Sequence, residues 1–310
     1  MEQQVRRLVT RSDFDGLACA MMLKELQLID EIKFVHPKDV QDGKIELSKN
    51  DITTNLPYAP RVSLAFDHHE SEMDRLKAVE TGGKLIIDPK ARSAARVVYD
   101  YYGGKEAFPR ISEDLMTAVD KGDSADFTMD EILDPKGWVL LHYLMDARTG
   151  LGRFHHFRIS NYDLMMQLID YCLDHDIDEI LELPDVKERV ELYFEQAEQF
   201  KAQLRRIARV HDKVVVLDLR KEEVIHAGNR FMIYALYPET EISVHVAWGF
   251  RKQNTAVMIG KSIVNKASQV DIGELCLQYG GGGHRNAGTC QLDNDVVDEK
   301  LPDIIRALNG

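Results

Sequence analysis

The first hundred residues alternate short apolar segments with helical ones, and this alternation is what most restricts the fold. The sequence predicts short strands at RRLVT, IKFVHP, ITTN, VSLAF and KLIID. Two other segments are typical of helices, GLACAMMLKELQLI and SAARVVYDYY. Strands that alternate with helices indicate an α/β domain with a largely parallel sheet. In such sheets, functional side chains collect at the carboxyl ends of the strands.

The pattern changes beyond residue 112. Residues 112–182 are predicted to be mostly helical, and Val186–Val210 is predicted to form one long charged amphipathic helix. We interpret this helix as a connection between two domains; a surface helix of one domain is the alternative. Beyond it, strands are predicted at KVVVLDL, RFMIYALYP, ISVHVAWGF and TAVMIGKS, followed by helices at IGELCLQYG and LPDIIRALNG.

The length of 310 residues is too great for one ordinary core. We therefore predict three parts. These are an N-terminal α/β domain with a largely parallel sheet at 1–185, a long connector helix at 186–212, and a smaller C-terminal mixed α/β domain at 213–310.

Charge and composition argue against several classes of protein. No run of 18 apolar residues suggests a membrane span, and MEQQVRRLVTRSDFDG has no apolar signal core, so we expect a cytoplasmic protein. The four cysteines are scattered without a CxxC pair, which disfavours disulfides and a zinc knuckle. The net charge of −13 disfavours long duplex nucleic acid as a partner, although carboxylates can surround divalent cations.

Asp13 and Asp15 flank Phe14 in a turn between a predicted strand and a predicted helix. Two carboxylates at positions i and i+2 can point at one cation, and the helix N-terminus behind them favours anions such as phosphate. Gly16 lets the backbone turn tightly. The simpler interpretation of an aspartate at this position is a helix N-cap.

Asp67, His68 and His69 directly follow the predicted strand VSLAF. Carboxylate and imidazole together suit Mn²⁺, Mg²⁺ or Zn²⁺. Adjacent residues at a strand end point in different directions, so one histidine can ligate a metal while its neighbour faces a substrate. A chance pair of surface histidines is the alternative.

The run from Gly280 to Gly283 leaves backbone N–H groups bare, so an anion can approach closely. His284 and Arg285 follow it and add side-chain donors for phosphate. A flexible glycine turn is the alternative. A further acidic stretch, 120–126, reads DKGDSAD, and a solvated loop is its simplest interpretation.

SDFDG, FDHH and GGGGHRNAG occur in an order and spacing that is specific in combination. This combination resembles the DHH phosphoesterases with their DHH-associated C-terminal domain, over a span from Leu8 to Gln291. The pattern is similar to the nanoRNase, oligoribonuclease and RecJ-like groups, and some members are exopolyphosphatase-related. The resemblance implies hydrolysis of phosphate esters with one or two divalent cations, Mn²⁺ or Mg²⁺.

The resemblance also implies three groups of site residues. The catalytic residues are expected to be Asp67, His68 and His69, with His68 as metal ligand and His69 as phosphate contact. The metal ligands are expected to be Asp13, Asp15, Asn55, Asp67, His68 and Asp120, with Asp123 competing for the place of Asp120. The substrate-binding residues are expected to be Arg11, Arg92, Ser93, Arg230 beside Asn229, Gly281, Gly282, Gly283, His284 and Arg285.

Two positions depart from the family pattern. Arg11 stands where many members have a histidine, and arginine cannot ligate a metal. Asn55 stands where an aspartate usually bridges both cations, and its amide carries no charge. We expect the cation site of Asp15, His68 and Asp120 to be kept, and the other to be weak or filled only with substrate. Arg11 could replace the missing cation's charge and hold a phosphate directly.

Three functions fit these features. The first is a metal-dependent phosphoesterase of small phosphorylated substrates such as short oligonucleotides or nucleoside bisphosphates, with domain closure bringing His284 to the metals. The second is a degenerate nucleotide-binding or regulatory protein, which Arg11 and Asn55 favour. The third is an exopolyphosphatase-like enzyme, which a long basic groove would favour. We predict the first, with short single-stranded nucleic acid as an alternative partner, no membrane contact, and a homodimer as an alternative to a monomer.

Overall fold

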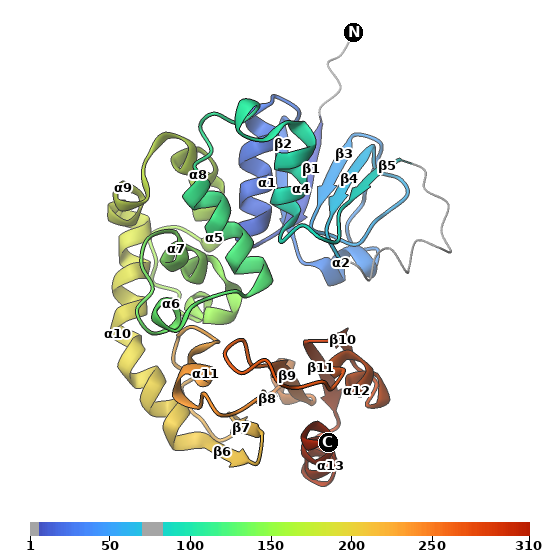
Figure 1. Cartoon of the computed structure of the whole chain (residues 1–310), viewed down its shortest axis with the longest axis vertical. Helices are drawn as coiled ribbons and strands as arrows, with labels where there is room; N and C mark the ends of the chain where they lie inside the picture. The colour runs from blue at the N-terminus through green and yellow to red at the C-terminus, as the bar shows by residue number, and fades with distance from the viewer. Residues whose placement is uncertain (1–5, 70–82) are drawn as a thin grey trace. The chain divides into compact units, whose positions relative to one another are not determined.

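The computed structural model describes residues 6–69 and 83–310 (Figure 1). Its contacts divide the chain into two compact units. The first unit comprises residues 1–127, 135–147 and 151–191, and the second comprises 128–134, 148–150 and 192–310. The long helix α10, Pro184–Ile207, contributes residues to both units.

The first unit is built on a sheet that has five strands within its described part, all paired in parallel. The order is β2-β1-β3-β4-β5. The strands are β1 (Arg7–Arg11), β2 (Glu31–Val35), β3 (Asp51–Thr54), β4 (Leu64–Asp67) and β5 (Lys84–Ile87). Strand β1 lies between β2 and β3, and its Leu8 and Val9 have no exposed surface. The prediction of a largely parallel sheet is therefore confirmed.

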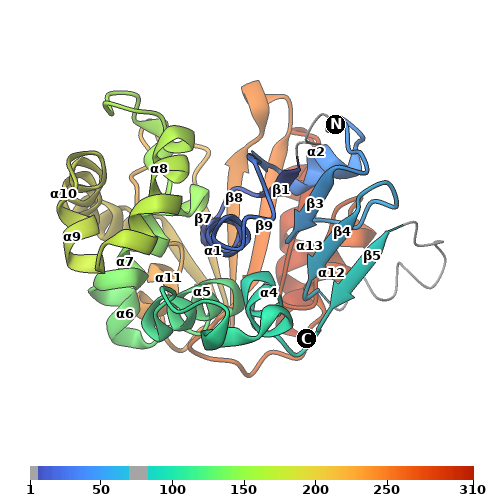
Figure 2. The same ribbon diagram turned by 90° about the horizontal axis from the view of Figure 1, so that it is seen from above.

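The helices of this unit that the structure describes follow the strands or succeed one another beyond them. They are α1 (Phe14–Glu25), α2 (Pro37–Gln41), α4 (Ala94–Tyr102), α5 (Glu113–Ser124), α7 (Gly137–Met145), α8 (Asn161–Asp174), α9 (Ile177–Glu182) and the first part of α10. Helix α1 is buried on nearly every side from Phe14 to Leu23, as expected of a helix that is apolar all round. It packs against α4, α5 and α8, and Figure 2 looks along its axis.

Gly16 explains how α1 can begin so close to the end of β1. A Cβ atom at this position would lie 2.0 Å from the backbone oxygen of Arg11 and 2.9 Å from Oγ1 of Thr10. No larger residue fits there without moving the backbone. The glycine therefore fixes the tight strand-to-helix turn that carries Asp13 and Asp15.

The second unit has a mixed sheet with the order β10-β11-β9-β8-β7-β6. Only β7 and β8 pair in parallel among its described strands. The strands are β6 (Ala208–His211), β7 (Val214–Asp218), β8 (Ile242–Trp248), β9 (Thr255–Lys261), β10 (Gly282–His284) and β11 (Ala287–Leu292). The predicted smaller C-terminal mixed α/β domain is confirmed as a fold.

One face of this sheet forms the core of the second unit. Val244 and Val246 of β8 and Val257 of β9 pack there with helices α12 (Ile272–Gln278) and α13 (Val297–Asn309). Burying a side chain of this size stabilises a fold by about 1.5–3 kcal/mol. The unit also contains the short helices α6 (Met129–Leu133) and α11 (Met232–Leu236).

Two predictions for this part of the chain need correction. RFMIYALYP, predicted as a strand, contains helix α11 instead. A short apolar run does not distinguish a buried helix from a strand, and here Asn229 Oδ1 accepts a hydrogen bond from the Phe231 backbone N–H at 2.9 Å and supports the entry to the helix. The long helix ends at Ile207 rather than Val210, because Ala208–His211 pairs with β7.

None of the helices in the described residues is both long enough and apolar enough to cross a membrane.

Candidate functional site

The polar motifs of the first unit follow three neighbouring strands. Strand β1 lies beside β3, and β3 beside β4, with Thr10 opposite Thr54 and Thr54 opposite Phe66. Because all three strands run in the same direction, their carboxyl ends meet at one edge of the sheet. The three motifs that begin at Arg11, Asn55 and Asp67 therefore lie close together, as parallel-sheet sites do.

Asp15 is the most deeply held carboxylate of this group. Its two oxygens accept the backbone N–H groups of Ala94 and Ala95, at 3.0 and 2.7 Å, where α4 begins. Asp15 as a whole is 3% exposed. Burial, and then the negative charges of Asp123 and Asp13, raise the pKa of Asp15 well above its usual range. A divalent cation would offset this cost, because it favours the ionised carboxylate.

His68 is oriented by the backbone. Its Nδ1 lies 3.3 Å from the carbonyl oxygen of Ala91, so the Nδ1–H can donate to that oxygen. Its Nε2 lies 2.7 Å from Oδ2 of Asp123. A histidine that donates one ring N–H to a carbonyl and presents the other nitrogen to a carboxylate is arranged as metal-binding histidines are.

The protonation of His68 reflects its neighbours. Burial disfavours the charged ring, but the hydrogen bond to Asp123 and the surrounding carboxylates outweigh it and raise the pKa of His68 to about 9. Burial likewise opposes ionisation of Asp123, yet the hydrogen bond and charge of His68 lower the pKa of Asp123 overall. In the cation-free protein, the proton on His68 therefore provides positive charge to this acidic cluster.

Asp15, His68 and Asp123 form a donor set that fits a divalent cation. Their ligand atoms all lie within 4.8 Å of one another. Two carboxylates and one imidazole suit Mn²⁺ or Mg²⁺ among the hard and borderline cations. The three residues come from α1, from the segment after β4 and from α5, so the fold rather than one local motif brings them together.

Asp67 orients His69. Its Oδ1 lies 2.7 Å from Nδ1 of His69 and accepts the backbone N–H of His68 at 2.9 Å. Asp67, His68 and His69 also lie close enough to share an ion. However, one oxygen of Asp67 already accepts these N–H groups. The side chain of His69 is 31% exposed, so its ring can reach a substrate while Asp67 remains buried.

Asp13 is engaged within the chain through both oxygens. Oδ1 accepts the backbone N–H of Gly16 at 2.9 Å, which makes Asp13 the N-cap of α1. Oδ2 lies 2.8 Å from Nε of Arg11, and the two side chains form an ion pair that is partly exposed. The N-cap interpretation of Asp13 is therefore confirmed, and its second oxygen is paired with Arg11.

Asn55 occupies an unusual backbone conformation directly after β3. Its φ is 53°, in the left-handed region that asparagine tolerates better than most residues. Its Nδ2 lies 3.5 Å from Oδ1 of Asp13, and the residue is 2% exposed. Its Oδ1 is buried and has no hydrogen-bond partner among residues 6–69 and 83–310. Such an orphaned oxygen is a suitable neutral ligand for a cation.

Asp120 does not join this cluster. Its oxygens accept Oγ–H of Ser93 at 2.8 Å and Nη2–H of Arg96 at 2.6 Å. Ser93 has no exposed surface and caps α4 through the N–H of Arg96. Arg92 lies on the surface and pairs with Asp126 at 3.2 Å. Asp120 and Ser93 thus connect α4 to α5, whereas Asp123, the competing choice, lies with Asp15 and His68.

The motifs did not predict the backbone groups of Ala94 and Ala95, which hold Asp15, or Arg96, which neutralises Asp120. A signal for the first two was present. Ser93 stands directly before a helical run, and a serine there is a common N-cap whose following N–H groups are available to an anion. Helix α4 thus provides a carboxylate-binding end to Asp15.

The glycine-rich motif of the second unit forms the hairpin of β10 and β11. A Cβ atom on Gly281 would lie 2.2 Å from the oxygen of Thr289, and one on Gly283 would lie 2.3 Å from that of Ala287. At Gly282 there is open space instead. Two of the glycines are therefore required for packing, while Gly282 leaves backbone accessible.

At the tip of this hairpin, His284 and Arg285 are exposed, and the N–H of Lys261 donates to the oxygen of Asn286 at 2.9 Å. Elsewhere in the unit, Asn229 is buried and donates to the oxygen of Ile132 at 3.2 Å. The Arg230 guanidinium stacks 4.0 Å from the ring centre of Phe231, on the neighbouring residue. The exposed hairpin tip can meet an anion, whereas Asn229 has a structural contact.

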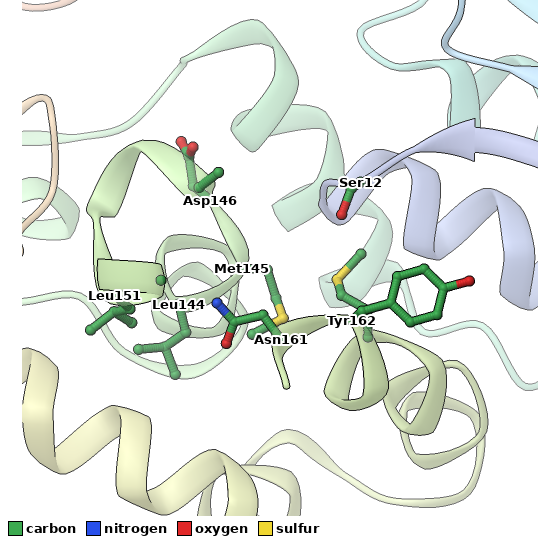
Figure 3. A pocket seen from close by; sticks show the side chains of 10 residues that line it. Ser12, Leu144, Met145, Asp146, Leu151, Asn161 and Tyr162 are labelled. Carbon is green, nitrogen blue, oxygen red and sulfur yellow. The ribbon is translucent and has the colours of Figure 1, made fainter. Parts of the chain in front are cut away.

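A cavity of about 150 Å³ lies beside the β1–α1 turn. Figure 3 shows Ser12 on one side of it and Asn161 and Tyr162 on the other. The remaining lining residues are Leu144, Met145, Asp146, Ala147, Leu151, Gly152 and Met165. Pockets for drug-sized ligands measure about 300–1,000 Å³, so this cavity has room for one ring system at most.

The first unit has carboxylates and imidazole at the carboxyl edge of a parallel sheet, and the second unit has an exposed glycine hairpin. These are features of a metal-dependent phosphoesterase. The chain is similar to a solved pGpG-specific phosphodiesterase from Vibrio cholerae. The two are 55% identical over 98% of this chain and 99% of the other, with a TM-score of 0.83. No protein-family model and no curated protein matches the chain.

Two more distant structures share the fold. An exopolyphosphatase-related protein from Bacteroides fragilis is 12% identical over 100% of this chain and 95% of the other, with a TM-score of 0.54. RecJ from Thermus thermophilus, solved in complex with Mn²⁺, is 16% identical over 99% of this chain and 52% of the other, with a TM-score of 0.51. The chain belongs to the DHH superfamily, as its motifs predicted, and it is a phosphoesterase of small phosphorylated substrates.

Proposed function

We propose that this phosphoesterase hydrolyses short linear dinucleotides of the pGpG type. Water adds to the internal phosphodiester, one P–O bond breaks, and two nucleoside monophosphates leave. The observation that carries this proposal is the 55% identity, over nearly the whole chain, to a pGpG-specific phosphodiesterase. The net charge of −13 agrees with it, because a strongly acidic chain is better suited to a short substrate than to long duplex nucleic acid.

We assign the cation to Asp15, His68 and Asp123, with Asn55 Oδ1 as a neutral fourth donor. When bound, a divalent cation supplies Lewis-acid chemistry, since it neutralises phosphoryl charge and lowers the pKa of water. Mn²⁺ is the better candidate, because an imidazole in the donor set suits it more than Mg²⁺. The backbone N–H groups at the start of α4 donate to Asp15 and hold this carboxylate in place before the ion binds.

His69 is the residue that we assign to proton transfer at the phosphate. Asp67 accepts from Nδ1–H of His69, which selects the tautomer whose Nε2 can accept or return a proton. Asp67 is thus a positioning residue for His69. In the second unit, Gly281, Gly282, Gly283, His284 and Arg285 are assigned to binding a substrate phosphate.

A substrate panel tests the function. pGpG, a five-nucleotide RNA, cyclic di-GMP, 3′-phosphoadenosine 5′-phosphate and polyphosphate are each incubated with Mn²⁺, with Mg²⁺ or with chelator, and products are separated by chromatography. We expect cation-dependent cleavage of pGpG to two equivalents of GMP. Faster hydrolysis of polyphosphate would favour the exopolyphosphatase-like alternative, and binding without turnover would favour the regulatory one.

Two variants make the panel specific. Asp67→Ala should lose turnover, because His69 loses its orientation. Asp114→Asn should keep it, since Asp114 is an exposed carboxylate in the first turn of α5, the helix that carries Asp123. Equal loss in both variants would mean that the effect is not specific to the site.

A cytoplasmic location and a homodimer remain predictions, which fractionation and light scattering would test.

A further inference from the structure

Arg11 is the last residue of β1 and brings a permanent positive charge to the site. Its Nε lies 2.8 Å from Oδ2 of Asp13, and its side chain is 34% exposed. The other oxygen of Asp13 accepts the N–H of Gly16 at 2.9 Å and lies 3.5 Å from Nδ2 of Asn55. Both oxygens of Asp13 therefore have partners supplied by the chain. A metal ion at Asp13 would have to displace a guanidinium that is always charged.

Asn55 gives a second reason against two ions here. Two-metal sites hold their cations about 3.5–4 Å apart, and such a separation needs anionic ligands between the ions to offset their repulsion. Asn55 stands between the turn of Asp13 and the strand that ends at Asp67, because β3 lies between β1 and β4. Its amide carries no charge. Its buried Oδ1 can complete the shell of one ion, but it does not screen two.

We propose that this site takes one divalent cation, and that the Arg11 guanidinium takes the place of a second and binds the scissile phosphate directly. The inference rests on the proposed cation site of Asp15, His68 and Asp123 and deepens the proposed function. A guanidinium has five N–H donors in a planar fork. Its Nε is paired with Asp13, and the planar fork of a guanidinium has further N–H groups whose geometry matches two phosphate oxygens.

In this arrangement Asp13 is a positioning residue rather than a metal ligand. It caps α1 with one oxygen and holds Arg11 with the other, so the guanidinium is fixed with respect to the strand end. The charge of Arg11 also acts on Asp123, across the site. The guanidinium and the single ion can therefore flank one phosphate group and share its negative charge, as a pair of metal ions does elsewhere.

Ion counting tests this inference without substrate. Metal-free protein is loaded with Mn²⁺, passed through a desalting column and analysed for bound metal and by electron paramagnetic resonance. We expect one ion per chain and the six-line spectrum of isolated Mn²⁺. The double variant Arg11→His with Asn55→Asp, which restores a ligand and an anionic bridge, should bind two ions with a spin-coupled spectrum. Two ions or spin coupling in the unaltered chain would overturn the inference.

Substrate binding provides the second arm. Arg11→Ala should raise KM for pGpG by about 10–100-fold, the loss expected for a charged hydrogen-bonding pair, with the Mn²⁺ count still one. Arg11→Lys should recover part of this loss, because it restores charge but not the planar fork. Arg6→Ala, at an exposed arginine just before β1, is the matched control. An unchanged KM in Arg11→Ala, in protein shown to be folded by circular dichroism, would refute the phosphate contact.

The two proposals fail in different ways. No bound Mn²⁺ in folded protein would overturn both the cation site and the inference. Two bound ions would overturn the inference alone and leave the phosphodiesterase in place. One bound ion with no turnover of pGpG would overturn the proposed substrate, while the ion count would still support the role of Arg11.

Discussion

The two units present their candidate phosphate-binding groups in opposite ways. In the first unit, carboxylates and a histidine are buried and already fixed by backbone groups: Asp15 by two N–H groups, and His68 by a carbonyl oxygen. In the second, the hairpin tip of His284 and Arg285 is exposed, and Gly282 next to it has open space. In a buried site, the fold fixes the positions of the side chains. In an exposed hairpin, the side chains are accessible to a substrate but are held by fewer contacts.

The contrast suits each unit to a different role in the proposed reaction. Chemistry at phosphorus needs groups that do not reorganise during the reaction, and the sheet edge supplies them. Capture of a charged substrate needs donors that solvent and substrate can reach, and the hairpin supplies those. Substitutions of the buried carboxylates and of His68 should therefore act mainly on kcat and ion binding. Substitutions in the hairpin should act mainly on KM, as should those of the partly exposed Arg11.

The largest effect is expected for Asp123→Asn. The amide keeps the size of the side chain but loses the charge that faces His68 and the cation. We expect kcat to fall by about a thousandfold, which corresponds to the several kcal/mol that a metal ion contributes to a transition state. Steady-state kinetics with saturating Mn²⁺ measure this. A variant with normal kcat would show that Asp123 does not hold the ion.

The pH dependence of stability should reveal His68. Its folded-state pKa of about 9 lies above the unfolded value of 6.5, so its contribution is fully present below pH 6.5 and is lost as the pH rises through 9. Linkage gives at most about 3 kcal/mol for such a shift. Thermal unfolding in chelator between pH 6 and 9.5 should show this decline. His68→Gln should flatten it, and an equal slope in that variant would assign the decline to other groups.

Asp120→Ala should separate folding from chemistry. The change leaves the Arg96 guanidinium and Ser93 without their acceptor in a mostly buried place. We expect a loss of about 2–4 kcal/mol in the free energy of unfolding, with Mn²⁺ binding unchanged. Denaturant titration measures the first quantity and calorimetry the second. Lost ion affinity with unchanged stability would instead support Asp120 as the ligand.

The smallest effect is expected on the hairpin. His284→Ala should raise KM by about tenfold, as the loss of one hydrogen bond to a charged group does, and leave the ion count unchanged. Asn286→Ala, at an exposed neighbour in the same turn, is the control. An unaltered KM would exclude His284 from substrate binding, and a large fall in kcat alone would remove the contrast between the two units.

Much of the fold followed from local patterns, because parallel strands and their polar ends leave strong signals. The strand that ends at Asp67 and the turn at Gly16 are examples. Helix α11 did not follow, because a short apolar run has no period long enough to distinguish a helix from a strand. The end of the long helix was also misplaced, since pairing of β6 with β7 ends it.

The candidate site shows a different limit. Asp120 and Asp123 are three residues apart on α5, so both lie near one face of the helix and sequence leaves the choice between them open. In the structure, Arg96 of α4 binds Asp120, and on this ground we propose Asp123 as the ligand. Likewise, no pattern in TRSDFDG reveals that Arg11 pairs with Asp13. Such contacts depend on how elements pack, and local sequence does not encode them.

The way in which Asp15 is held has a consequence for the evolution of the site. Its partners are peptide N–H groups of Ala94 and Ala95, and nearly every substitution at these two positions keeps the N–H. Proline alone among the standard amino acids removes it. The anchoring of this carboxylate therefore depends on the backbone of α4 and not on the chemistry of any side chain. Ala94 and Ala95 have no exposed surface, so these two positions require small side chains but no particular functional group.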